Sequence, residues 1–209
     1  MKITVLTESE LRKCVTLDQE SLAAVAEGFS YLSKGKATVP PVMRILVPER
    51  RGEVDVKSAY IRGPESFAIK IASGFSKNLD LGLQKSSGMM ILISSQTGFP
   101  KAVLFDNGYL TQVRTGAAGA LAADFLARKN IETVGVIGSG TQARYQMRAL
   151  KLVREFVRLL VYGIVSKEVE CYAEEMSTSL DVEVVIAGKA ETVVRESDAV
   201  VTTTPSREP

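Results

Sequence analysis

Three basic residues stand where surface lysines and arginines are uncommon, and the first is Arg44 in PVMRILVP. In an extended strand Val42 and Leu46 share its face, while Met43 and Ile45 occupy the other face. A strand that is apolar on both faces is expected to be buried, and a buried guanidinium needs an anion beside it. The pattern therefore predicts an anionic ligand at Arg44. Two alternatives are an internal Asp or Glu partner and an exposed position at a sheet edge.

Lys70 is the second of these residues and lies in SFAIKIASGF. Ala68 and Ala72 flank it on one strand face, and such small neighbours leave a recess in which a ligand could lie. Desolvation there would disfavour the charged amine, which suits a proton donor or acceptor. The alternative is a solvated face with short neighbours. Lys57 shares a face with Asp55 and is expected to point to solvent.

Arg114, the third, belongs to the segment DNGYLTQVRTGAAGALAADFLARKN. This segment predicts a turn followed by a helix of very small residues, which is apolar over much of its surface and suits a linker between two lobes. Arg114 is predicted in the first turn of that helix, where the helix dipole disfavours a cation. An anionic ligand is therefore one explanation for its position.

A glycine motif follows in TVGVIGSGTQAR, where Gly138, Gly140 and Ala143 form G-x-G-x-x-A between a predicted strand and a predicted helix. Gly138 would permit the tight turn, Gly140 would let the backbone approach a pyrophosphate, and Ala143 would let helix and strand pack closely. The N-terminus of the helix offers free N–H groups to phosphates. In this βαβ setting the motif predicts a dinucleotide site, with a ligand-free tight turn as the alternative.

The acidic residue that usually binds the ribose of NAD is missing. It is expected about 20 residues after the motif, at the end of the second strand. Here that strand ends at Gly163, which is followed by Ile164, Val165, Ser166 and Lys167. Ser166 and Lys167 could receive the 2′-phosphate of NADP, or they could simply begin the next helix, so both NAD and NADP stay open.

The chain has no histidine, which excludes Ser-His and Cys-His catalysis and the usual zinc sites. No metal site is predicted, and general acid–base catalysis is left to Lys, Asp, Glu or Tyr. Cys14 and Cys171 lie far apart in helix-like contexts, so we predict buried free thiols.

The elements that position these residues change character near residue 130. Before it, residues 18–33 predict an amphipathic helix with Gly35 just past its end. Its apolar face consists of Leu22, Val25, Ala26, Phe29 and Leu32. Five strands follow, namely PVMRILVP, EVDVKSAYI, SFAIKIASGF, GMMILISS and KAVLFD. The link QTGFP predicts a hairpin between the last two, so much of this sheet should be antiparallel.

After residue 130, predicted strands near 133–138, 158–163, 182–187 and 198–204 alternate with helices at 141–154, 166–178 and 189–196. This alternation implies parallel strands joined by right-handed crossovers. The predicted fold is therefore α/β, with an incomplete Rossmann-type parallel sheet of about four strands and an α+β lobe before it. The predicted domains are residues 1–130 and 131–209.

Composition excludes several classes of protein. The 209 residues are 45% hydrophobic and 24% charged with a net charge of +2, which is compatible with a folded core. No basic stripe or aromatic cluster suggests nucleic-acid binding. The N-terminus lacks the apolar core of a signal peptide, and no stretch approaches the roughly 18 apolar residues of a membrane helix. We expect a soluble, cytoplasmic protein.

Together, PPVM before Arg44, GEVDVKSAY, FAIKIASGF, GMMIL, DNGYLTQVRTGAAGALAA and VIGSGTQAR resemble the ornithine cyclodeaminase and mu-crystallin family. The resemblance is strongest to its bacterial cyclodeaminase-like, ectoine-utilisation and imino-acid-reductase branch, and runs over the whole chain. It implies a homodimer whose subunit has a β-rich substrate and dimerisation lobe and a Rossmann lobe. It also implies binding of NAD or NADP and a small amino or imino acid as substrate.

The resemblance also implies roles for individual residues. Arg44, Lys70 and Arg114 match the family's substrate-binding residues, and we predict Lys70 as the catalytic acid. The predicted cofactor-binding residues are Arg114, Thr115, Gly138, Ser139, Gly140, Thr141 and Gln142. The predicted activity is NAD(P)-dependent reduction of an imino acid or dehydrogenation of an amino acid. The alternatives are an ammonia-releasing cyclodeaminase that recycles NAD, and a truncated protein that only binds a nucleotide or small molecule.

The chain departs from the family in length more than in the missing acidic residue near Gly163. Members of the family are about half as long again as these 209 residues. The chain stops at VVTTTPSREP, after the fourth predicted Rossmann strand, whereas a complete doubly wound sheet typically has six. The part beyond would carry the rest of the nicotinamide pocket and, in the cyclodeaminases, a catalytic aspartate. We therefore expect a fragment, a truncated gene product or part of a longer protein.

Overall fold

The computed structural model describes residues 2–206 of the chain. Contacts divide the chain into two compact units. Unit 1 comprises residues 1–16 and 27–111, and unit 2 comprises residues 17–26 and 112–209. The division falls within one helix, between Thr111 and Gln112. The assignment of functions to residues 1–130 and 131–209 stays a prediction.

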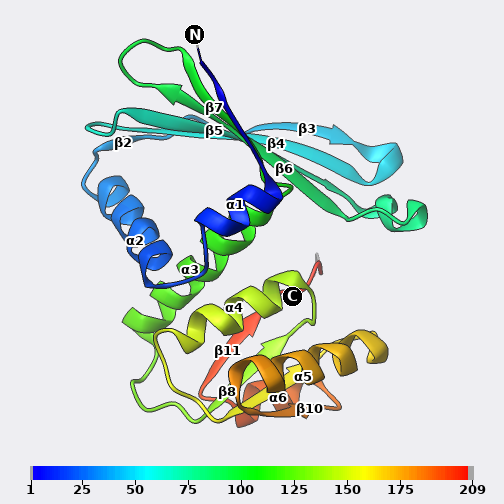
Figure 1. Cartoon of the computed structure of the whole chain (residues 1–209). Helices are drawn as coiled ribbons and strands as arrows, with labels where there is room; N and C mark the ends of the chain where they lie inside the picture. Colours follow the sequence, from blue (N-terminus) through cyan, green and yellow to red (C-terminus); the bar gives the residue numbers. More distant parts are fainter. Residues whose placement is uncertain (1, 207–209) are drawn as a thin grey trace. The chain divides into compact units, whose positions relative to one another are not determined.

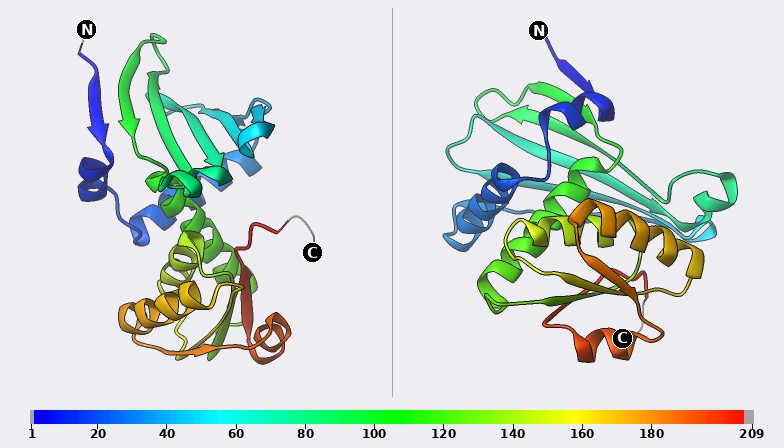
Figure 2. Two further views of the ribbon diagram at one scale, coloured as in Figure 1. Left: turned by 90° about the vertical axis from the view of Figure 1, so that its right-hand side faces the viewer. Right: turned by 60° about the horizontal axis from the view of Figure 1, so that its bottom comes forward.

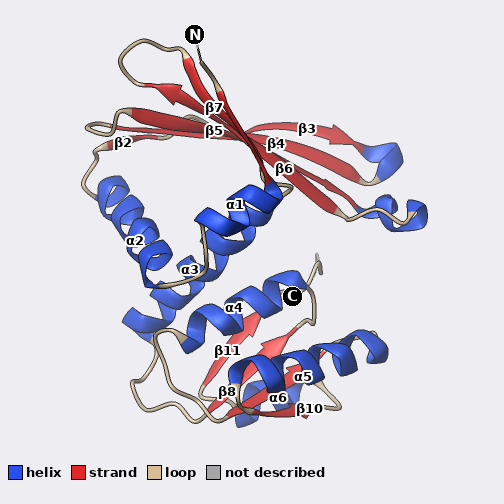
Figure 3. Ribbon diagram, in the orientation of Figure 1, coloured by secondary structure: helices blue, strands red, loops and turns tan. Residues whose placement is uncertain are grey.

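Unit 1 is built on a seven-stranded sheet with the order β1-β7-β6-β5-β4-β2, in which β3 also pairs with β4 (Figures 1 and 3). The strands are β1 (Thr4–Thr7), β2 (Ala37–Thr38), β3 (Met43–Val47), β4 (Gly52–Ile61), β5 (Ser66–Phe75), β6 (Ser86–Ser94) and β7 (Pro100–Phe105). All pairs are antiparallel except β1 with β7. The five predicted strands and the β6–β7 hairpin are confirmed, and the short strands β1 and β2 were not predicted.

Two α-helices precede the long strands. Helix α1 spans Glu8–Cys14, and α2 spans Gln19–Ser33 and is divided between the two units. The predicted helix over residues 18–33 is confirmed, and Gly35 follows it with a φ of 66°. Its apolar face is only partly covered, because Leu22 is buried while Phe29 and Leu32 are more than half exposed. Two 3-10 turns, at Pro48–Arg50 and Ser76–Leu81, complete the unit.

Unit 2 contains a parallel four-stranded sheet with the order β10-β9-β8-β11. Its elements after α3 (Tyr109–Leu126) are β8 (Thr133–Ile137), α4 (Thr141–Lys151), β9 (Arg158–Tyr162), α5 (Ser166–Leu180), β10 (Glu183–Ile186), α6 (Ala190–Glu196) and β11 (Ala199–Thr202). The predicted alternation and the parallel Rossmann-type sheet are confirmed. Helices α4 and α5 cover one face of the sheet and α6 covers the other (Figure 2).

The larger core lies in unit 2. Val134, Val136, Leu159 and Val161 are fully buried on the face beneath α4 and α5, where the fully buried Met147 joins the same cluster. This is the pattern of parallel strands that are covered on both faces. Unit 1 has few fully buried side chains, and every residue of β5 is only partly buried.

The buried side chain of Arg154 binds the C-terminal end of helix α3. The Arg154 guanidinium donates to the Asp124 carboxylate and to the backbone carbonyls of Ala123, Asp124, Ala127 and Arg128. The last carbonyls of a helix have no partner within the helix, so one side chain satisfies several of them at once. No feature of the sequence had indicated this role for Arg154.

The prediction of buried thiols is wrong, because Cys14 and Cys171 are free but exposed. Both lie on outward faces of helices α1 and α5, and their helical setting alone did not fix which face is covered. None of the helices in the described part of the chain could span a membrane. Within residues 2–206 no cluster of three or more His, Cys, Asp or Glu side chains could hold a metal ion.

Candidate functional site

The turn between β8 and α4 requires glycine at position 138. Gly138 has a φ of 111°, and its N–H donates to the Tyr162 carbonyl at 2.8 Å. A Cβ there would lie 2.6 Å from Thr203 Oγ1 and 3.1 Å from the Thr203 carbonyl oxygen. The first glycine of the motif therefore lets β8 turn sharply beside the residue that follows β11.

Gly140 is different because it faces open space. It precedes the first residue of α4 with a φ of −81°, and a Cβ there would meet nothing within 4 Å. Ala143, by contrast, is fully buried against the sheet. The loop thus combines a forced turn, an uncovered backbone at a helix N-terminus and a tightly packed small residue, which is the arrangement that accepts a pyrophosphate. The assignment of Gly138, Ser139, Gly140 and Thr141 to cofactor binding stays a prediction.

Arg144 holds this loop in place, and the sequence had not indicated it. Its guanidinium donates to the Ser139 carbonyl at 2.5 Å and to Glu175 at 2.6 Å. The same group lies 5.2 Å from the ring centroid of Tyr172, and burial raises the pKa of the Tyr172 hydroxyl. The loop backbone is therefore fixed by a charge-assisted bond from its own helix.

An acidic side chain at Gly163, directly after β9, would crowd its neighbours. A Cβ at Gly163 would lie 2.7 Å from Val169 Cγ2 and 3.3 Å from Ser139 Oγ. Ser166 and Lys167 are exposed and form the first residues of α5, so they do begin the next helix, as one of the two alternatives predicted. Their position at the helix start leaves the choice between NAD and NADP open.

The glycines of RTGAAGALAA have a packing role. A Cβ on Gly116 would lie 2.8 Å from the Tyr145 carbonyl of α4, and one on Gly119 would overlap the Gln146 side chain. Gln146 also donates to the Thr115 carbonyl at 2.9 Å. The small residues therefore let α3 approach α4, the helix that begins at the glycine loop.

Gln142 is held by the same pair of helices, since its side chain donates to Gln112 of α3. Its Oε1 atom is buried and accepts no hydrogen bond within the described residues. A buried acceptor without a donor is uncommon in folded proteins. The cofactor role of Gln142 stays a prediction.

Arg114 does not lie in the first turn of α3, and that expectation is wrong. The helix already begins at Tyr109, because the Asp106 carboxylate accepts the Leu110 N–H, and Arg114 is its sixth residue. The dipole acts mainly within the first turn, so it no longer explains the position of Arg114. The residue is exposed as a whole, yet desolvation lowers the pKa of its guanidinium.

Arg44 lies on an exposed strand, not the buried strand that its apolar neighbours predicted. Every residue of β3 except Val47 is exposed. The alternative of an internal carboxylate is confirmed: Arg44 Nε lies 2.7 Å from Asp55 Oδ1, and Nη2 lies 2.9 Å from Oδ2. Asp55 is only 7% exposed and also accepts the Lys57 ammonium at 2.9 Å. Hydrogen bonds from Arg44 and then Lys57 hold the pKa of Asp55 well below its usual range.

Lys70 occupies the middle of β5, with Ala68 and Ala72 on its face as predicted. Its ammonium lies 3.4 Å from the Thr111 hydroxyl, at the start of α3. Lys57 is its direct partner on β4, so both lysines share one face of the sheet. Arg44 and Lys70 belong to unit 1, and Arg114, Thr115 and the glycine loop belong to unit 2.

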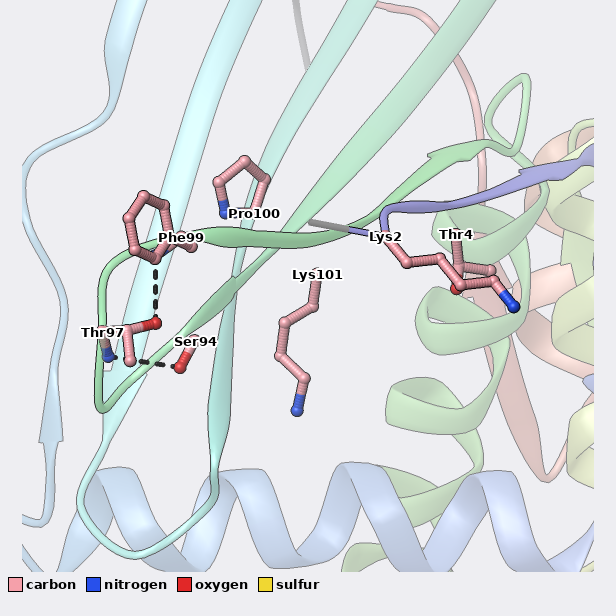
Figure 4. Close-up of a pocket in the computed structure, with 7 residues that line it drawn as sticks. All are labelled: Lys2, Thr4, Ser94, Thr97, Phe99, Pro100 and Lys101. Atoms are coloured by element: carbon pink, nitrogen blue, oxygen red, sulfur yellow. Dashed lines mark hydrogen bonds between the residues drawn. The ribbon is translucent and has the colours of Figure 1, made fainter.

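A pocket of about 520 Å³ lies elsewhere in unit 1 and contains none of the predicted site residues (Figure 4). It is lined by Lys2, Thr4, Ser94, Thr97, Phe99, Pro100 and Lys101. The hydroxyls of Ser94 and Thr97 accept backbone N–H groups of the β6–β7 turn. This pocket is therefore formed by the β6–β7 hairpin together with Lys2 and Thr4, and it carries no part of the candidate site.

Comparison with known proteins matches residues 1–209 to the ornithine cyclodeaminase/mu-crystallin family. The chain belongs to this family. It is 42% identical to an uncharacterised cyclodeaminase of Sinorhizobium fredii and 37% identical to an alanine dehydrogenase of Archaeoglobus fulgidus, over 98% and 100% of its own length. It spans only 62% of the length of each of these relatives.

Two solved structures show the same fold at 34% identity. One is the Thermococcus litoralis Δ1-pyrroline-2-carboxylate reductase in complex with NADH and L-proline, with a TM-score of 0.93 over 99% of this chain and 64% of that one. The other is an archaeal alanine dehydrogenase dimer with bound NAD, with a TM-score of 0.91 over 100% of this chain and 62% of that one. The predicted family and fold class are confirmed.

Proposed function

We propose that this chain is part of an NAD(P)-dependent oxidoreductase that acts on a small imino or amino acid. The observation that carries the proposal is the glycine loop, where Gly140 leaves the backbone uncovered at the N-terminus of α4 in a parallel sheet. The relatives that bind NAD or NADH and act on alanine or a cyclic imino acid support it.

In this proposal the basic residues bind the substrate. Arg44 and Arg114 would bind the substrate carboxylate, and Lys70 would donate a proton near the imine nitrogen. Asp55 accepts two of the five N–H groups of Arg44, so the remaining three are the ones that could reach a substrate. The bound nicotinamide would supply the hydride chemistry.

A cyclodeaminase is the second candidate, because a relative with 42% identity is named as one. The two activities differ in cofactor balance. A reductase consumes one reduced cofactor for each product, whereas a cyclodeaminase regenerates its NAD within each cycle and releases ammonia. Spectrophotometric measurement of NADH alongside an ammonia assay separates them.

We also propose a homodimer formed through the open face of the unit 1 sheet. Val5, Met43 and Ile45 are each at least 51% exposed on the face opposite Arg44 and Lys70. Val54 and Ile71 share that face by strand register and are only partly buried. Contiguous apolar surface of this kind is typical of a protein interface. Analytical ultracentrifugation should show a dimer that Ile45→Lys converts to a monomer.

The first test of function is a titration of this chain with NADH and NADPH, followed by nicotinamide fluorescence. Saturable binding of either would support the proposal, and the tighter ligand would identify the cofactor. Lys70→Ala in the active protein should abolish turnover while leaving cofactor binding unchanged. Wild-type turnover in that variant would exclude Lys70 as the proton donor, and absence of binding to both cofactors would count against the site in this chain.

A further inference from the structure

The loop between β8 and α4 is held by two different kinds of bond. Its first residue is fixed by the sheet, because the Gly138 N–H donates to the carbonyl of Tyr162, the last residue of β9, at 2.8 Å. Ser139 and Gly140 follow, and neither belongs to a strand or a helix. Backbone outside regular structure loses conformational entropy when it is fixed, so these two residues need other bonds to hold one conformation.

The side chain of Arg144 supplies these bonds. Its Nη1 atom donates to the Ser139 carbonyl at 2.5 Å and to the Gly140 carbonyl at 3.3 Å. In the described part of the chain it is the only side chain that binds these two carbonyls. Its Nε atom donates to Glu175 of α5 at 2.6 Å, and its guanidinium lies 5.2 Å from the ring centroid of the fully buried Tyr172. Helix α5 therefore holds Arg144, and Arg144 holds the loop.

The geometry of the peptide bond converts these contacts into a direction for two N–H groups. A peptide unit is planar and trans, so its C=O and its N–H point in opposite directions. Because Arg144 binds the Ser139 carbonyl, the Gly140 N–H points away from the guanidinium. The same relation holds for the Gly140 carbonyl and the N–H of Thr141, which has no partner within the helix that it begins. Both residues are exposed, so one arginine orients two donors on a part of the loop that is open to a ligand.

We propose that Arg144 is a positioning residue for the pyrophosphate of the cofactor. It fixes the peptide units of Ser139 and Gly140 before the cofactor binds, so the N–H groups need no reordering on binding. This inference rests on the proposed function and specifies how its cofactor loop is held. The role needs a guanidinium, because Nη1 binds the carbonyls while Nε binds Glu175. The single ammonium of a lysine cannot take both places.

The test uses three variants of the full chain. Arg144→Met removes the charge and both sets of bonds, and Arg144→Lys keeps the charge but not the guanidinium. Arg148→Met is the matched control, because Arg148 lies one turn further along α4 and binds the other oxygen of Glu175 at 2.8 Å. Affinity for NADH and NADPH is measured by nicotinamide fluorescence. NMR relaxation of the Gly140 amide in the ligand-free protein reports the order of the loop, and urea denaturation shows that each variant is folded.

Both substitutions of Arg144 should weaken NADH binding about 10- to 100-fold, because one or two residues must then be ordered as the cofactor binds. The order parameter of the Gly140 amide should fall from about 0.85 to below about 0.6 in both variants. Arg148→Met should keep the order parameter and bind NADH within about 3-fold of the wild type, since it loses only a partly exposed charge contact. A residue that merely stabilised unit 2 would change the urea midpoint without changing the order of Gly140 in the folded protein.

Failure of this inference is distinguishable from failure of the proposed function. Wild-type NADH affinity in Arg144→Met or in Arg144→Lys, an equal loss in Arg148→Met, or an unchanged order parameter in Arg144→Met would overturn the role of Arg144 and leave the oxidoreductase proposal standing. A wild type that binds neither NADH nor NADPH would overturn both. If NADH binding depends on Arg144 but no amino or imino acid is turned over, the inference stands and the oxidoreductase proposal falls.

Discussion

Alanine at Gly138 and alanine at Gly140 should have opposite effects, although the two glycines belong to one motif. At Gly138 the φ of 111° is a conformation that costs an L-residue about 1–3 kcal/mol. The new Cβ would also lie 3.1 Å from the carbonyl oxygen of Thr203, a backbone atom that cannot rotate away. Overpacking of this kind costs about 1–3 kcal/mol. Gly138→Ala should therefore lower the free energy of unfolding by about 2–6 kcal/mol.

Gly140→Ala should leave the fold intact. Its φ of −81° suits alanine, and the Cβ would meet nothing within 4 Å. Replacing glycine at a compatible position stabilises a protein by about 0.4–1 kcal/mol through the unfolded state. The same Cβ would project into the open side of the loop, where a pyrophosphate must approach the backbone. We expect affinity for NADH to fall at least about 10-fold, which corresponds to about 1.4 kcal/mol.

Urea denaturation followed by circular dichroism measures the first effect, and NADH fluorescence titration measures the second. Gly28→Ala in α2 is the control, since Gly28 is an interior helical residue where a Cβ would meet nothing within 4 Å, and the variant should gain about 0.5–1 kcal/mol. Thr203→Ala in the Gly138→Ala background should restore only the stability lost through the contact with Thr203 Oγ1. A Gly138→Ala protein as stable as the wild type would refute the close-approach reasoning. Unchanged NADH affinity in Gly140→Ala would refute the placement of the pyrophosphate.

Three further predictions concern unit 2. Arg154→Met should lower the free energy of unfolding by about 2–4 kcal/mol in urea, because it removes the donors to Asp124 and to the last carbonyls of α3. Gly116→Ala should cost about 1–3 kcal/mol by the same assay, since its Cβ would lie 2.8 Å from the Tyr145 carbonyl. Asp198 has a lowered pKa, caused first by two backbone N–H donors and then by Arg128. Its stabilisation is present above the unfolded pKa of about 3.9 and is lost as pH falls through the lower folded value, so Asp198→Asn should flatten the stability profile in that acid range.

Much of the fold was predictable because hydrophobic period and turn residues agreed locally. The β8–β11 alternation and the β6–β7 hairpin were recognisable for that reason. Strand β1 was missed since it has only four residues, Thr4–Thr7, and forms by pairing with β7, which lies far along the chain. The start of α3 was placed too late because Asp106 caps the helix from within the turn DNGY.

The backbone of the candidate site was predictable from the sequence, whereas the partners of its charged residues were not. The spacing of the glycines predicted the loop, because a positive φ and a close backbone contact both require glycine at a particular position. The sequence around a charged residue carries no comparable signal of which residue it will pair with in the fold. Arg44 and Asp55 meet through strand register, and Arg144 reaches Glu175 across two helices, so neither pairing follows from local spacing. The apolar residues around Arg44 predicted a buried strand, but β3 is exposed within this chain.

The two units obtain their stability in different ways, and this bears on where the substrate could bind. The unit 2 sheet is covered by helices on both faces and has a fully buried core. The unit 1 sheet has an apolar face that is open around Met43 and Ile45 and a basic face with Arg44, Lys57 and Lys70. A second copy can cover the apolar face, because it offers the same surface about a two-fold axis. Apolar side chains offer no donor to a carboxylate, whereas Arg44 on the other face of the sheet keeps three N–H groups that Asp55 does not use. We therefore expect a carboxylate substrate on the side of the sheet that carries Arg44.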